Sequence, residues 1–178
     1  MATVYTMGHS TREMAEFSRI LQAHEVRLLV DIRAFPVSRR HPQFNRESME
    51  AWLPQAGCGY LWEKDLGGKR SRQMPPELSP HIALRDEAFR NYADYMLSPQ
   101  FQKAAGRLVE RAAEQRTAIL CAEALYLNCH RMLVSDYLLS QRHTVLHILD
   151  EGPPKEHTLS QDARMIDEKL IYRGDRLL

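Results

Sequence analysis

The stretch CAEALYLNCHR, residues 121–131, carries most of the reactive side chains of this chain. Two of the three cysteines lie in it, and the second, Cys129, is followed at once by histidine and arginine. Asn128 is a good helix cap, so we predict that Cys129 lies in the first turn of a helix. The helix dipole and a neighbouring cation lower the pKa of a thiol at such a position, and the resulting thiolate can act as a nucleophile.

The same stretch also has the composition of an anion site. Arg131 can hold a carboxylate or phosphate through two parallel hydrogen bonds, and the free amides of a helix start would assist. A purely structural alternative is that Cys129 packs as a small apolar side chain and Arg131 forms an ion pair. Neither Cys121, ten residues before Arg131, nor Cys129, two residues before it, has the cysteine-to-arginine spacing of the phosphatase signature.

A metal centre or a redox pair would use the same side chains. Cys121, Cys129, His130 and His9 are ligand types that zinc accepts. Seven residues separate the cysteines, which is more than in a strong zinc motif, and adjacent residues on a helix point about 100° apart. We therefore expect no metal and no organic cofactor. A thiol redox sensor using Cys121 and Cys129 stays open as an alternative, and it requires their Cα atoms to lie within about 7 Å.

Three further side chains are candidates for moving a proton. Asp31 and Glu123 each follow an apolar stretch, and His9 lies beside Ser10 before the first predicted helix. An arginine lies near each carboxylate in sequence, Arg33 in the case of Asp31, so structural ion pairs explain both acids equally well.

Residues 33–46 form a basic segment with interleaved aromatic side chains. It contains Arg33, Arg39, Arg40, His41 and Arg46 together with Phe35 and Phe44, and no acidic residue. Cations beside aromatic rings suit a phosphate backbone with a base that can stack. A nucleic-acid-associated function is therefore an alternative to a small ligand.

The elements that must position these side chains follow a regular alternation. Apolar runs predict strands at 4–8, 26–33, 59–68, 117–123 and 144–149, and helical spacing predicts helices at 9–24, 45–57, 86–97, 98–115, 128–141 and 160–169. Ser10 and Glu13 have capping-box spacing, and Ser98-Pro99 is a typical helix start. We predict a single three-layer α/β sandwich domain over 1–178, with a mainly parallel five-stranded sheet. Residues 150–178 would be a C-terminal extension, packed on the domain or partly flexible.

Ligands of such folds bind beyond the carboxyl ends of the strands. The loops at that edge contain His9, Ser10, Asp31, Arg33, Arg39, Phe44, Asn45, Gly67, Gly68, Cys121, Glu123, Cys129, His130 and Arg131. We predict that Cys129, Glu123, Asp31 and His9 are available for catalysis and that the others bind the ligand.

Several motifs, in order, resemble the bacterial and archaeal family called domain of unknown function 488. They are MGHSTREMAEFSRIL, LLVDIRAFPVSRRHPQFN, DLGG, YADYM and CAEALYLNCHR. The resemblance implies a compact α/β domain with no assigned activity, and it places family signature positions on His9, Ser10, Asp31, Arg33, Phe44, Asn45, Gly67, Gly68, Cys121, Glu123, Cys129, His130 and Arg131. Relatives have a charged, proline-containing turn where this chain has residues 124–127.

The composition sets limits on partners. The 178 residues are 44% hydrophobic and 26% charged, with a formal net charge of +1, so no global attraction to nucleic acid or to a membrane is expected. The odd cysteine count and the absence of a long apolar run predict a reduced, cytoplasmic protein. We expect it to bind a small anionic or nucleotide-like ligand. The pattern leaves open whether the chain is an enzyme and which oligomer it forms.

Overall fold

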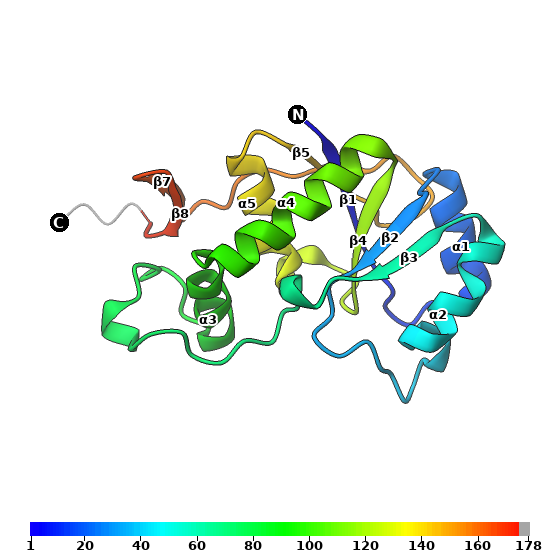
Figure 1. Cartoon of the computed structure of the whole chain (residues 1–178), viewed down its shortest axis with the longest axis horizontal. Coiled ribbons are helices and arrows are strands. Elements are labelled where there is room, and N and C mark those ends of the chain that lie inside the picture. Colours follow the sequence, from blue (N-terminus) through cyan, green and yellow to red (C-terminus); the bar gives the residue numbers. More distant parts are fainter. Residues whose placement is uncertain (175–178) are drawn as a thin grey trace.

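Five parallel strands form the centre of the sheet in the computed structural model, which describes residues 1–174 (Figure 1). They are β1 (Thr3–Gly8), β2 (Leu28–Asp31), β3 (Gly59–Trp62), β4 (Thr117–Cys121) and β5 (Thr144–His147), and the short β6 (Lys155–Glu156) joins β5 in antiparallel direction. The strand order is β3-β2-β4-β1-β5-β6. The predicted α/β fold with a mainly parallel sheet is confirmed, and β6 extends the sheet to six strands.

Helices cover both faces of this sheet (Figure 1). The helices α1 (Met14–Ala23) and α2 (Arg46–Trp52) pack on one face, and α3 (Glu87–Met96), α4 (Pro99–Glu114) and α5 (Arg131–Ser140) pack on the other. Strand β2 supplies both cores, because Leu29 faces α1 and α2 whereas Leu28 and Val30 face the opposite layer. Burial on both faces explains why this strand is a continuous apolar run.

Two predicted helix starts have opposite outcomes. Ser98 caps α4 as predicted, since its Oγ accepts the N–H of Phe101 at 3.2 Å. The capping box predicted at Ser10 is wrong, because α1 begins at Met14 and no side chain caps it. Ser10 instead has a left-handed φ of 51° and donates its N–H to the Ala122 carbonyl at 2.9 Å. This bond ties the β1–α1 loop to the end of β4.

Helix α5 begins later than the sequence predicts. Its first residue is Arg131, and a 3-10 turn, Tyr126–Asn128, precedes it. Cys129 is extended, with φ −146° and ψ 167°, so the prediction that it lies in the first turn of a helix is wrong. Its neighbour His130 is the N-cap residue. The two side chains are therefore not bound to the 100° separation of helical neighbours.

The C-terminal segment forms a hairpin. Strands β7 (Ala163–Ile166) and β8 (Lys169–Tyr172) pair in antiparallel direction, so the helix predicted for 160–169 is wrong. Ala163, Leu170 and Tyr172 are buried and join the core that α3, α4 and α5 form. Residues 175–178 of the predicted extension lie outside the described residues. Across 1–174, no helix combines the length and the apolar character needed to cross a membrane.

Candidate functional site

The carboxyl ends of β1, β2 and β4 bring the predicted site residues to one edge of the sheet. Gly8 pairs with Cys121, so His9 follows β1 directly beside the end of β4. A cavity of about 280 Å³ opens at this edge. His9, Arg33, Phe35, Ser38, Gly68, Lys69, Cys121 and His130 are among its lining residues. A second hollow adjoins it at His9 and Ser38 and is lined by Ser10, Arg39, Arg40 and Glu123. The loops that the strand-end rule selected therefore meet around this cavity.

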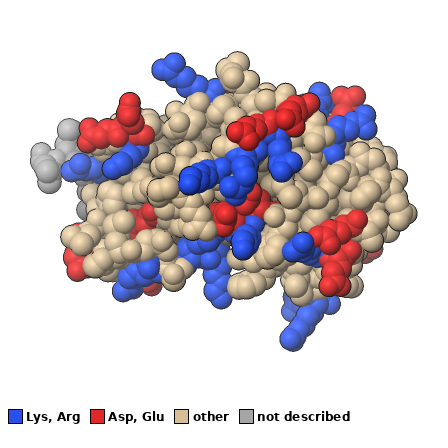
Figure 2. Space-filling model, in the orientation of Figure 1, with Lys and Arg blue, Asp and Glu red and all other residues tan. Residues whose placement is uncertain are grey.

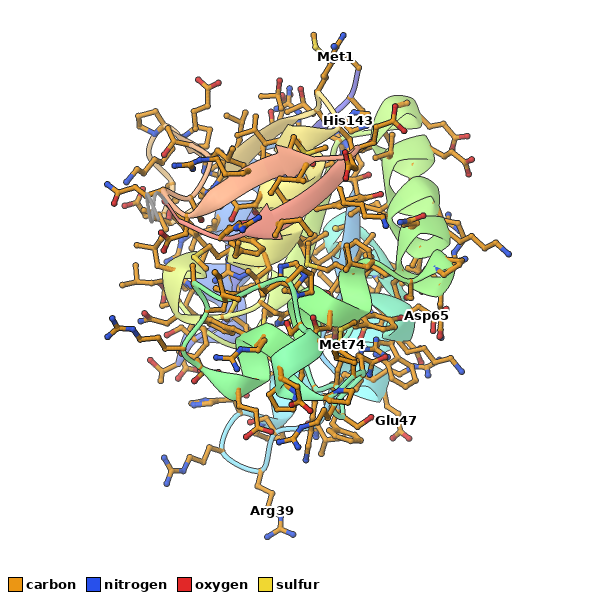
Figure 3. All side chains as sticks on the ribbon, turned by 90° about the vertical axis from the view of Figure 1, so that its left-hand side faces the viewer. Met1, Arg39, Glu47, Asp65, Met74 and His143 are labelled. Atoms are coloured by element: carbon orange, nitrogen blue, oxygen red, sulfur yellow. The ribbon has the colours of Figure 1, made fainter. Side chains whose placement is uncertain are left out.

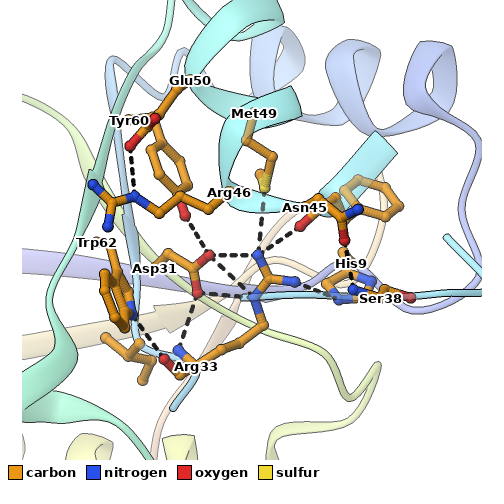
Figure 4. Close-up of polar contacts among 12 residues, drawn as sticks. His9, Asp31, Arg33, Ser38, Asn45, Arg46, Met49, Glu50, Tyr60 and Trp62 are labelled. Carbon is orange, nitrogen blue, oxygen red and sulfur yellow. Dashed lines mark hydrogen bonds and ion pairs between the residues drawn. The ribbon is translucent and has the colours of Figure 1, made fainter. Parts of the chain in front are cut away.

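Asp31 and Arg33 form a buried ion pair beneath this edge (Figure 4). The Asp31 carboxylate accepts Arg33 Nε at 2.9 and 3.1 Å and the Tyr60 hydroxyl at 2.6 Å. Arg33 also donates to the Phe44 carbonyl at 2.7 Å. Asp31 is 0% exposed. The acceptor atoms of Asp31 are thus occupied by structural donors. This arrangement matches a structural ion pair, the alternative to a carboxylate that moves a proton.

His9 is held as a neutral imidazole. Its ring stacks on Phe44 with centroids 4.5 Å apart, and burial lowers its pKa to about 4. Nδ1 donates to the Ser10 carbonyl at 2.8 Å, and Nε2 accepts Arg33 Nη1 at 3.3 Å. His9 would have to leave Arg33 before Nε2 could take a proton from a ligand.

Cys121 and His130 line the cavity, and Cys129 lies beside them. The two Sγ atoms and a ring nitrogen of His130 all lie within 4.8 Å of one another, and the three residues are buried. His130 Nε2 donates to the Ile32 carbonyl at 2.8 Å, which leaves Nδ1 facing Cys121 Sγ at 3.9 Å. This grouping joins the end of β4 to the residues just before α5.

The ring of His130 is fixed from two sides. Tyr92 packs edge-on against it, with centroids 5.1 Å apart. Gly68 lies on the ring face, because a Cβ at that position would stand 2.4 Å from Nδ1 and 2.7 Å from both Cε1 and Cγ. The neighbouring Gly67 also has no room for a side chain, because a Cβ there would lie 2.9 Å from the Lys64 carbonyl oxygen.

Cys129 receives several hydrogen bonds to sulfur. The hydrogen bond from the Cys121 thiol lowers the pKa of Cys129 and raises that of Cys121, and the charge of Arg131 adds to the lowering. Arg131 reaches Sγ with its backbone N–H at 3.4 Å and with Nε at 3.3 Å. A thiolate is thus favoured at Cys129 without the helix dipole that the sequence suggested.

Arg131 has partners other than the predicted anion. It is 1% exposed, and its Nη2 donates to the carbonyls of Glu123 and Ala124. These bonds fix the loop after β4, so the role of Arg131 is to position this loop. The Glu123 side chain is exposed at the rim, while Asn45 uses Oδ1 to accept the Ser38 N–H at 2.5 Å.

The accessible cations lie around the mouth of the cavity. Arg39 and Arg40 are exposed, and within residues 1–174 neither has an ion-pair partner. Figure 3 shows Arg39 pointing away from the protein into solvent. Lys69 lies over the Phe35 ring at 5.6 Å. On the face shown in Figure 2, by contrast, basic and acidic side chains are interspersed.

A buried polar chain behind Arg131 was missed by the sequence analysis. Arg131 Nη1 donates to Thr6 Oγ1 at 3.4 Å, and Thr6 is 2.7 Å from His147 Nδ1. His147 Nε2 is 2.9 Å from His157 Nδ1, and His157 Nε2 is 2.9 Å from Asp136 Oδ1. An acid inside the apolar run LVSDYLL was the available signal, because such a side chain needs buried partners.

Fold and site define an α/β protein whose candidate site combines cysteines and histidines at the carboxyl edge of a parallel sheet. Residues 13–138 match the family described as domain of unknown function DUF488, and the chain belongs to this family. The family resemblance seen in the motifs is therefore confirmed. No curated protein and no solved structure matches the chain. His9, His157 and the β7–β8 hairpin lie outside the matched residues.

Proposed function

We propose that the chain binds a small anionic or nucleotide-like ligand in the cavity at the carboxyl edge of the sheet. The observation that carries this proposal is the arrangement of free cations and buried reactive groups around one cavity. Lys69 lines it, and Arg39 and Arg40 line the adjoining hollow. A ligand with a phosphate or carboxylate group could contact these cations without breaking the ion pair of Arg33.

The walls of the cavity support a ligand that also has an apolar or aromatic part. Phe35 and Val37 line the cavity and are 70% and 71% exposed. Exposed apolar side chains beside cations suit a base or ring that stacks while its anionic group is neutralised. Cys121 and His130 on the floor would lie next to such a ligand. Larger hollows near the hairpin lack a comparable grouping of cysteine and histidine in the described residues.

Titration with adenosine monophosphate and with pyrophosphate, followed by amide NMR shifts, tests the proposal. We expect shifts confined to residues 9–11, 33–41, 67–69, 121–124 and 130, and about tenfold weaker binding in a Lys69→Gln variant. Arg111→Gln is a matched control, because Arg111 is an exposed cation in the last turn of α4, away from the cavity. Binding equally weakened by both substitutions, or no saturable shifts at these residues, would contradict the proposal.

Salt dependence separates this function from the nucleic-acid alternative. A small ligand that meets two or three cations should lose affinity weakly as salt rises, whereas a polynucleotide that contacts many cations should lose it steeply. A steep loss for a single-stranded oligonucleotide, together with no binding of the mononucleotide, would favour the alternative.

A further inference from the structure

Cys121, Cys129 and His130, the first and last of which line the cavity, have the composition of a soft-metal site. Cys121, Cys129 and His130 are 7%, 5% and 8% exposed, and their ligand atoms lie within 4.8 Å of one another. Tetrahedral zinc with ordinary bond lengths places a sulfur and a nitrogen ligand about 3.5 Å apart and two sulfurs about 3.8 Å apart. Cys121 Sγ and His130 Nδ1 are 3.9 Å apart. Side-chain rotations that move these two atoms by a few tenths of an ångström would close this pair around an ion.

The orientation of His130 is an independent observation that points to a ligand. Its Nε2 donates to the Ile32 carbonyl at 2.8 Å, so the unprotonated Nδ1 is turned toward the sulfurs. A histidine that ligates a metal commonly donates its other ring N–H to a carbonyl or carboxylate, which fixes the tautomer and the ring. Gly68 occupies the face of the ring, so the in-plane lone pair of Nδ1 is left toward the sulfurs.

Arg131 supplies an outer shell for the sulfur ligand. Its backbone N–H and Nε both donate to Cys129 Sγ, at 3.4 and 3.3 Å. Such N–H donors delocalise the charge of a thiolate and hold it in place while the sulfur keeps lone pairs for an ion. The objection that neighbouring helical residues diverge does not apply, because Cys129 is extended and precedes α5.

We propose that Cys121, Cys129 and His130 bind one zinc ion, or a d¹⁰ cation of the same softness. Three protein ligands leave one coordination position, as in zinc sites that act on a substrate. Cys121 and His130 line the cavity, so this position would face it. For the role of the fourth position the inference rests on the proposed function, because an oxygen of the anionic ligand would occupy it. This proposal replaces the expectation, drawn from sequence spacing, that the chain binds no metal.

Zinc alone is the first probe, with the fully reduced full-length protein and a chromophoric chelator as competitor. We expect one Zn²⁺ per chain with a dissociation constant below about 1 μM at neutral pH. Cys129→Ser and His130→Gln should weaken binding by more than the roughly 10–100-fold typical of outer-shell changes. Cys58→Ala is the matched control, because Cys58 is equally buried but packs between the sheet and the layer of α1 and α2, and it should bind zinc like the wild type.

Cobalt provides a readout that does not depend on the folding of a variant. Wild-type protein loaded with Co²⁺ should show thiolate-to-metal charge-transfer absorption and the intense visible bands of tetrahedral coordination. Absence of these bands, no uptake of zinc by the reduced wild type, or unchanged affinity in Cys129→Ser would each overturn the proposal.

The two proposals can fail separately. Adenosine monophosphate that binds to the metal-free protein while zinc does not bind would remove the metal site and leave the ligand cavity. One bound zinc, with the cobalt spectrum above and no saturable binding of adenosine monophosphate or pyrophosphate, would establish the metal site and remove the proposed function.

Discussion

At the scale of single residues, the edge of the sheet combines side chains that hold the structure with others that are available to a ligand. Arg33 and Arg131 both have their donors engaged by protein acceptors, whereas Arg39, Arg40 and Lys69 are exposed. All five are basic residues, so residue type alone could not distinguish them. Burial and hydrogen-bond partners, which depend on the packed fold, separate the two groups.

Removing Asp31 should be costly because Arg33 would be left buried without a counter-charge. Arg33 is 6% exposed. We expect Asp31→Ala to lower the free energy of unfolding by about 3–5 kcal/mol in urea denaturation followed by circular dichroism. Glu50→Ala, which breaks the exposed pair with Arg46, should leave the free energy of unfolding almost unchanged, because solvent screens that pair. Similar losses in the two variants would mean that burial does not govern the Asp31 pair.

Acid should destabilise the protein through His147. Burial and the neighbouring His157 and Arg131 lower its pKa to about 3, while in the unfolded chain it keeps the ordinary value of 6.5. Between these values only the unfolded chain binds the proton, so stability is full above about pH 6.5 and falls with decreasing pH. Lowering the pH from about 7.5 to about 5 should remove about 2 kcal/mol through this group.

Urea denaturation at both pH values checks this linkage. The wild type should lose more stability on acidification than His147→Phe, by the same amount of about 2 kcal/mol. His81 is the comparison, because its pKa is also lowered, to about 4, and its share of the pH dependence should persist in His147→Phe. An equal pH dependence in the wild type and in His147→Phe would contradict the assignment.

At the scale of elements, the site depends on how closely the loop after β4 approaches the end of β1. A Cβ on Gly8 would lie 1.7 Å from the Glu123 carbonyl oxygen, which also accepts a hydrogen bond from Arg131. Gly8 is therefore required by a close approach between two backbone segments. The sequence shows a glycine at the end of a strand. It does not show that the backbone of Glu123, more than a hundred positions away, packs against this glycine.

Two glycine substitutions with opposite expected signs test this packing. Gly8→Ala should lower the free energy of unfolding by about 3 kcal/mol or more, because the carbonyl of Glu123 must move. Gly106→Ala should raise it by about 0.5–1 kcal/mol, since Gly106 lies within α4 and a Cβ there meets nothing within 4 Å. Chemical denaturation of both variants supplies the measurement, and a destabilised Gly106→Ala would show that helix propensity does not dominate at that position.

At the scale of the whole molecule, one carboxylate connects the C-terminal segment to the sandwich. Asp136 on α5 is 0% exposed and accepts hydrogen bonds from His157 Nε2, Ser160 Oγ and Tyr172 OH. These three partners come from residues beyond the family match at 13–138. The acid therefore connects the matched part of the chain to the β7–β8 hairpin.

Asp136→Ala should release the hairpin more than the sheet. We expect hydrogen exchange of the amides in 163–172 to accelerate at least tenfold, equivalent to about 1.4 kcal/mol, while β1 and β4 keep most of their protection. Asp150→Ala is the control, because this exposed carboxylate accepts only the nearby Gly152 N–H among the described residues. Uniform acceleration across the sheet would instead indicate that Asp136 supports the whole core.

Local sequence patterns were sufficient to predict the alternation of strands and helices, the family of the protein and the loops that gather at the carboxyl edge of the sheet. These features depend on local periodicity and on short motifs, which neighbouring residues encode directly. Only the packed fold shows where α5 begins, that the segment 163–172 is a hairpin, and that Cys121, Cys129 and His130 converge. Convergence depends on contacts such as His130 with Ile32, 98 positions apart. No local pattern contains such a contact, because it arises only when the layers pack.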